Sequence, residues 1–103
     1  MNVQKTMDSI KAWTEVQFPE QNVLGKLSHL KEEITELQNA VDNDIKTDID
    51  DELADCWILL LDVTSHLKYN EKTVKSIIDN KLAINKARKW GKPTREGIVH
   101  HIH

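Results

Sequence analysis

The sequence has few of the residues that break secondary structure or cross-link a chain. Its 103 residues include three glycines, two prolines and a single cysteine, Cys56. One cysteine excludes an internal disulfide framework and a cysteine-rich zinc site. The shortage of turn residues argues against many short strands. The composition therefore favours a few long helices in one small domain that spans residues 1–103.

Long apolar runs and an excess of positive charge are missing as well. No segment is apolar over the roughly eighteen residues that a membrane helix needs, and the N-terminus lacks the apolar run of a signal peptide. We therefore expect a cytoplasmic protein that does not bind a membrane. Fourteen Lys and Arg residues against seventeen Asp and Glu give a net charge of −3, which argues against binding to duplex nucleic acid.

What the sequence does contain is helical periodicity. Apolar residues recur at helical spacing, and the predicted helices cover residues 3–17, 22–42, 47–67 and 73–89. Asp42 to Asp44 should form a polar connection with Asn43 as a cap, and Gly91 with Pro93 should end the last helix. Residues 92–103 form a C-terminal tail without a clear period. The sequence therefore predicts an all-α protein of four helices.

The third predicted helix has no polar side over part of its length. From Cys56 to Leu61 it is apolar all the way round, and such a helix is covered on every side. We expect Trp57 to pack there. One chain of this size could hardly cover the whole helix, so we predict a homo-oligomer. The alternative is that this helix is the central helix of a monomer.

Two acidic pairs border the apolar faces of the second and third predicted helices. Glu33 and Glu36 are three residues apart, as are Glu52 and Asp55, so each pair projects from one face of its helix. In an antiparallel hairpin the pairs can face one another, and four close carboxylates must then take up protons or bind a cation. Oxygen-only ligands indicate Mg²⁺ or Mn²⁺. Solvated helix faces are the alternative interpretation of the same residues.

A basic cluster lies near the end of the fourth predicted helix. Lys81, Asn85 and Arg88 share one face and could hold phosphate oxygens, although cations near a helix C-terminus also complement the helix dipole. No glycine-rich phosphate loop is present, so phosphate binding would depend on side chains and metal. Trp13 could line a pocket or belong to the core. Three C-terminal histidines are expected to bind metal only adventitiously: His100, His101 and His103.

These motifs resemble those of the MazG-like all-α nucleotide pyrophosphohydrolases. Glu33-x-x-Glu36 followed, after fifteen residues, by Glu52-x-x-Asp55 is similar to the signature of that family. The strings at 29–33, 59–62, 81–93 and 97–102 look most like its dATP/dGTP diphosphohydrolase branch, which is frequent in phage and prophage. The resemblance covers nearly the whole chain. It implies a four-helix MazG-like bundle that assembles as a homodimer or a dimer of dimers.

The resemblance also implies an activity and the residues that carry it. The expected reaction is hydrolysis of a nucleoside triphosphate, with a deoxynucleotide favoured, to the monophosphate and pyrophosphate, in nucleotide-pool cleansing or phage DNA metabolism. The ligands of Mg²⁺, or of Mn²⁺ in its place, would be Glu33, Glu36, Glu52 and Asp55, with Glu33 or Glu36 as the catalytic base. The candidate substrate-binding residues are Lys81, Asn85, Arg88 and Asp62, to which we add His29 and Trp13.

Two functions of other classes remain open from the sequence. In a helical protein-interaction module the acids would be merely solvated, and the apolar helix would bind a partner. A nucleotide sensor would bind its ligand without hydrolysing it. Strong stabilisation by Mg²⁺ would argue against the interaction module, and analysis of the products separates a sensor from an enzyme.

Overall fold

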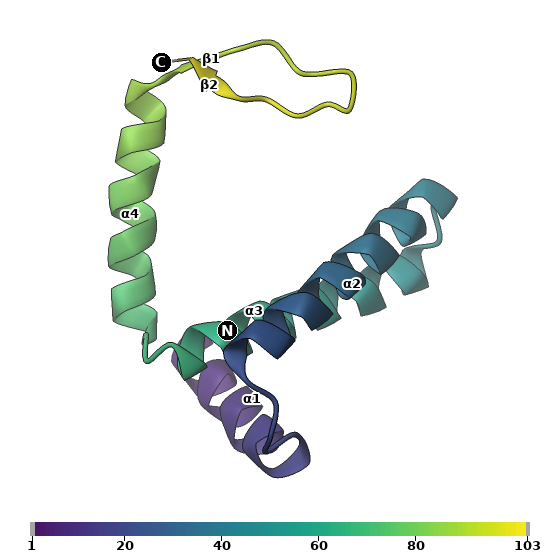
Figure 1. The fold of residues 1–103 in the computed structure, drawn as a ribbon, viewed down its shortest axis with the longest axis vertical. Coiled ribbons are helices and arrows are strands. Elements are labelled where there is room, and N and C mark those ends of the chain that lie inside the picture. Colours follow the sequence, from purple (N-terminus) through teal and green to yellow (C-terminus); the bar gives the residue numbers. More distant parts are fainter. Residues whose placement is uncertain (1, 103) are drawn as a thin grey trace. The chain divides into compact units, whose positions relative to one another are not determined.

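The computed structural model describes residues 2–102, and the predicted histidine His103 lies outside them. Helices α1 (Val3–Gln17), α2 (Val23–Asn43), α3 (Lys46–His66) and α4 (Glu71–Ala87) are followed by two short strands, β1 (Lys89–Trp90) and β2 (His101–Ile102) (Figure 1). The four predicted helices are confirmed, and with them the all-α class. Over the described residues, no helix combines the length and the apolar character that crossing a membrane requires.

The chain divides into two compact units, Met1–Asn70 and Glu71–His103. The first unit contains α1, α2 and α3, and the second contains α4 and the two strands. One domain over residues 1–103, with a tail from residue 92, stays a prediction.

Helices α2 and α3 form a hairpin with a very short connection. The side chain of Asn22 starts α2 by accepting a hydrogen bond from the backbone N–H of Gly25 over 2.7 Å. The predicted cap at Asn43 is wrong, because Asn43 belongs to the helix and Asp44 ends it in the left-handed region at φ 54°. Asp tolerates that conformation better than most residues. The chain reverses there, and α3 runs back beside α2 (Figure 1).

The core of the first unit lies where α1 and α2 pack against α3, and it is unusually polar. The buried apolar side chains among the described residues are Met7, Ala40, Leu59 and Val63, and the buried polar ones are Thr14, Lys26, Asp62 and Ser65. Trp57, which we expected to pack, is 56% exposed in a single chain. The side of α3 that carries Trp57 is therefore not the side that α1 and α2 cover.

The second unit ends its helix earlier than predicted. We expected α4 to continue to Lys89, but it stops at Ala87 and Lys89 begins a strand. The indole Nε1 of Trp90 donates to the backbone carbonyl of Asn85 over 2.9 Å, which occupies an acceptor of the last helical turn. β1 pairs antiparallel with β2, and Trp90 meets the ring of His101 edge to face. The predicted irregular tail thus folds back on itself.

Candidate active site

The α2–α3 hairpin brings three of the predicted carboxylates together. Glu33, Glu36 and Glu52 each place one carboxylate oxygen within 4.8 Å of the other two. We call these three residues the acidic cluster. Glu33 and Glu52 are half-buried, whereas Glu36 is exposed. Like charges at this separation repel one another, so the cluster favours either protonation or a bound cation.

Two atoms of the acidic cluster lack any hydrogen-bond partner. They are Oε2 of Glu33 and Oε2 of Glu52, and both are buried. A buried acceptor without a partner costs free energy. The nearby carboxylate of Glu33, withdrawal from solvent and the nearby carboxylate of Glu36 raise the pKa of the Glu52 carboxyl from 4.5 to about 7. Carboxylate oxygens in this state fit a hard divalent cation, which would supply the missing partner and the missing positive charge.

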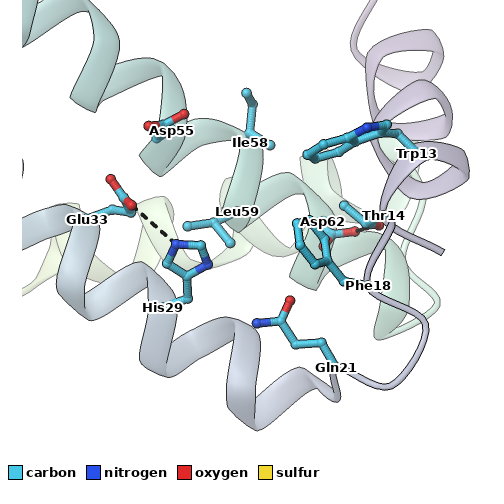
Figure 2. Close-up of a pocket in the computed structure, with 10 residues that line it drawn as sticks. All are labelled: Trp13, Thr14, Phe18, Gln21, His29, Glu33, Asp55, Ile58, Leu59 and Asp62. Atoms are coloured by element: carbon cyan, nitrogen blue, oxygen red, sulfur yellow. Dashed lines mark hydrogen bonds and ion pairs between the residues drawn. The ribbon is translucent and has the colours of Figure 1, made fainter. Parts of the chain in front are cut away.

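The fourth predicted ligand, Asp55, lies one helical turn beyond Glu52. It is exposed and is not one of the three mutually close carboxylates. Asp55 on α3 and Glu33 on α2 line the same end of a neighbouring pocket (Figure 2). The structure therefore places Asp55 beside the acidic cluster rather than within it.

That neighbouring pocket is mainly apolar and has a volume of about 180 Å³. Trp13 and Phe18 contribute a pair of aromatic rings that meet edge to face with centroids 5.5 Å apart, and Ile58 and Leu59 contribute aliphatic walls. We call it the apolar pocket. A concave apolar site with a few polar groups beside an acidic cluster is suited to a small ligand that carries both an aromatic ring and an anionic group.

Three predicted substrate-binding residues line the apolar pocket: Trp13, His29 and Asp62. His29 Nε2 lies 3.2 Å from Glu33 Oε1, which connects the pocket to the acidic cluster (Figure 2). The other three predicted residues, Lys81, Asn85 and Arg88, lie on or just after α4 in the second unit. Asn85 and Arg88 are half-buried and Lys81 is exposed.

The sequence analysis missed the buried partners of Asp62. Lys26 Nζ lies 2.7 Å from Asp62 Oδ2, and the hydroxyl of Thr14 donates to Asp62 Oδ1 over 2.8 Å. It also missed Phe18 and Gln21 in the pocket wall. Lys26 stands seven residues before Glu33, a spacing that places both on one face of α2. That shared face was the available signal, but a lysine on a helix flank is usually exposed.

Comparison with known proteins agrees with this geometry. The family model of the dATP/dGTP pyrophosphohydrolases matches residues 6–103. A solved structure of a MazG-like pyrophosphohydrolase from cyanophage S-2L, described as bound to dGDP and three catalytic Mn²⁺ ions per active site, is 35% identical in sequence. The match covers 100% of this chain and 99% of that one, with a TM-score of 0.79. No match was found among curated proteins.

The predicted MazG-like fold is therefore confirmed, and the predicted enzyme class is confirmed with it. An interaction module or a sensor without turnover is not what the family match supports. The chain belongs to the dATP/dGTP pyrophosphohydrolase family and is a nucleoside triphosphate pyrophosphohydrolase.

Proposed function

We propose that this enzyme hydrolyses a purine deoxynucleoside triphosphate between the α and β phosphates and releases the monophosphate and pyrophosphate. The observation that carries the proposal is the acidic cluster, in which two buried carboxylate oxygens have no partner. Triphosphate hydrolysis needs charge neutralisation and a well-placed water more than it needs a covalent nucleophile. Such an activity would serve nucleotide-pool cleansing or phage DNA metabolism.

The metal site consists, in this proposal, of Glu33, Glu36, Glu52 and Asp55. Their oxygens are the ligands that Mg²⁺ and Mn²⁺ prefer. When bound, the metal would neutralise phosphate charge and lower the pKa of a water molecule. The Mn²⁺ ions of the cyanophage structure support a divalent cation, and Mg²⁺ fits the same oxygen ligands.

Glu33 and Glu36 are the candidates for accepting a proton from the attacking water. His29 lies within hydrogen-bond distance of Glu33 and holds it at the edge of the apolar pocket, whereas Glu36 is exposed. The variants Glu33→Gln and Glu36→Gln remove one base each. Comparison of their turnover across a range of pH assigns the role, because only loss of the base removes the acidic limb of the rate profile.

The nucleoside occupies the apolar pocket in this proposal, and the phosphates extend toward the acidic cluster. Trp13 offers an aromatic ring on which a base can stack. Lys81, Asn85 and Arg88 bind phosphate oxygens, for which the guanidinium of Arg88 supplies paired donors. The family description and the dGDP of the cyanophage structure support a purine deoxynucleotide.

A second copy of the chain covers the remaining apolar face of the α2–α3 hairpin, so the enzyme assembles as a dimer or tetramer. A groove on that face is lined by seven residues: Leu30, Ile34, Leu37, Leu53, Cys56, Trp57 and Leu60. Leu53 and Leu60 are each 44% exposed in a single chain. An apolar patch of this extent on one face is typical of an interface between subunits.

The reaction is tested by resolving the products. Purified protein is given dATP, dGTP, dCTP or dTTP with Mg²⁺ or Mn²⁺, and nucleotides and phosphates are separated by chromatography. We expect the purine monophosphates and pyrophosphate in equal amounts, and no turnover in excess EDTA. Release of orthophosphate would contradict α–β cleavage, and full activity in EDTA would remove the metal from the mechanism.

A further inference from the structure

The end of the apolar pocket opposite Glu33 and Asp55 is closed by a buried carboxylate (Figure 2). Asp62 and Lys26 are each 1% exposed, and their side chains form an ion pair of 2.7 Å. Asp62 also accepts a hydrogen bond from Thr14. Because Thr14, Lys26 and Asp62 belong to α1, α2 and α3, the carboxylate is fixed by all three helices of the first unit.

His66 supplies a further donor to the same carboxylate. Its Nδ1 lies 3.0 Å from Asp62 Oδ1 and 2.8 Å from the backbone oxygen of Asp62. Both of these oxygens are acceptors, so Nδ1 carries the hydrogen. Oδ1 of Asp62 therefore accepts a hydrogen bond from Thr14 and lies close to His66 Nδ1, whereas Oδ2 has one donor, Lys26. Since a carboxylate oxygen has about two acceptor positions, one position on Oδ2 has no donor among the described residues.

Stability is a weak explanation for the pair of Lys26 and Asp62. The cost of removing two charges from water can exceed their attraction, and apolar residues of similar size often serve a core equally well. A wholly apolar pocket, however, discriminates poorly between ligands of the same shape that differ by a polar group. A fixed acceptor in its wall changes that, because a ligand without the matching donor leaves the remaining acceptor position of the carboxylate without a hydrogen bond.

We propose that Lys26 is a positioning residue that holds Asp62 as a hydrogen-bond acceptor in the wall of the apolar pocket, where Asp62 selects a nucleoside by one of its N–H or O–H groups. The inference rests on the proposed function of that pocket. The donor belongs either to the edge of the base or to the 3′-hydroxyl of the sugar, and the chemistry on the protein side is the same. Lys26 acts through Asp62 and does not touch the substrate.

The test compares dGTP with three analogues that each lack one donor. dITP lacks the 2-amino group, 2-aminopurine deoxynucleoside triphosphate lacks the N1–H, and 2′,3′-dideoxyGTP lacks the 3′-hydroxyl. We expect wild-type kcat/KM to fall about 10- to 100-fold for one of them, as for loss of a hydrogen bond to a charged group. The analogue whose kcat/KM falls identifies the base or the sugar as the source of the donor. Equal kcat/KM for all four substrates overturns the proposal without any variant.

The variant Lys26→Met/Asp62→Leu removes the acceptor and its counter-charge together, which avoids an unpaired buried charge. We expect it to melt cooperatively and to hydrolyse all four substrates with similar kcat/KM. Retention of the wild-type preference would overturn the proposal. Asp62→Asn, which keeps the side-chain size, takes its place if the double variant does not melt cooperatively, and it should weaken the preference.

Two further variants separate positioning from a merely structural role. Lys26→Met alone should raise KM for dGTP about tenfold or more while leaving kcat within a few-fold, and should erase the preference among analogues. The control Lys46→Met/Asp50→Leu removes an exposed ion pair of 2.9 Å and should leave the preference unchanged. If wild-type protein releases no pyrophosphate from any deoxynucleotide, the proposed function fails. Turnover with no change of preference in the double variant contradicts this inference alone.

Discussion

The two units of the chain differ in charge and in packing. Residues 1–70 contain six Lys and Arg against fourteen Asp and Glu, whereas residues 71–103 contain eight against three. All of the buried side chains among residues 2–102 belong to the first unit, and α4 has none. In the proposed function this difference corresponds to two tasks. The first unit, which contains the buried core, would hold the cation and the nucleoside, and the second would supply positive charge for the triphosphate.

The largest effect is expected from Glu52→Gln in the first unit, which carries the excess of acidic residues. Loss of this proposed ligand should lower kcat/KM for the preferred deoxynucleotide by about 10²- to 10⁴-fold, the range associated with groups that act directly in proton transfer and charge placement. Thermal stability without metal should stay equal or rise, because one repelling carboxylate is gone. Pyrophosphate release and melting in EDTA measure the two quantities.

Glu32→Gln is the matched control, because it removes the same charge from an exposed neighbour outside the acidic cluster. Asp55→Asn should behave like Glu52→Gln if the fourth ligand is needed. Wild-type turnover in Asp55→Asn, together with lower stability, would remove Asp55 from the metal site and leave three ligands.

A smaller effect is expected from Arg88→Gln in the second unit, which carries the excess of basic residues. Loss of charge-assisted hydrogen bonds to phosphate should raise KM about 10- to 100-fold. The rise in melting temperature that we expect from Mn²⁺ should not change, since the proposed metal ligands lie in the other unit. Steady-state kinetics and thermal melts with Mn²⁺ provide both readouts, with Arg95→Gln as the control. A weakened Mn²⁺ effect in Arg88→Gln would show that the two tasks are not separate.

Assembly provides a third test, because the apolar groove of the α2–α3 hairpin belongs to the first unit. Light scattering of the wild type should give at least twice the chain mass of 11.9 kDa. Trp57→Glu places a charge on that face and should shift the mass toward the monomer at micromolar concentration, since a buried unpaired charge is costly. A stable wild-type monomer would contradict the proposed interface.

The smallest effect is a pH dependence of stability in the absence of metal. The Glu52 carboxyl has a pKa of about 7 in the folded protein and 4.5 otherwise. Between these values the unfolded chain binds fewer protons, so stability is lost as pH rises from 4.5 through 7. The melting temperature in EDTA should therefore fall by a few degrees more in the wild type than in Glu52→Gln between pH 5 and pH 8. An equal fall in melting temperature between pH 5 and pH 8 in the two proteins would contradict the raised pKa.

Helical periodicity was enough to predict the fold, because long segments with regular apolar spacing leave little choice of secondary structure. The bounds of α1 match residue for residue, and those of α2 and α3 shift by one. The early end of α4 was not predicted. The backbone N–H of Arg88 and the indole of Trp90 both donate to the carbonyl of Asn85 there, and the spacing of apolar residues does not encode these local contacts.

The acidic pairs were visible in the sequence because a spacing of three residues is a property of one helix. The pairing of Lys26 with Asp62 was harder to predict. The face that Lys26 shares with Glu33 is a property of one helix, but the partner of Lys26 is 36 residues away and a lysine on a helix flank is usually exposed. Trp57 shows the opposite error. Its apolar character predicted burial, but it is 56% exposed in a single chain, and only the proposed second copy would cover it.

The reversal at Asp44 sets a rule for how the length of this protein can change. Glu36 and Glu52 stand eight residues before and after Asp44, so the tip of the hairpin is a symmetric extension beyond the acidic cluster. One inserted residue on either side would rotate the neighbouring carboxylate by about 100° around its helix axis. About seven residues added to each helix, close to two full turns, would lengthen the tip and leave the carboxylates facing each other. Functional relatives should therefore vary this interval in paired steps of about fourteen residues rather than one at a time.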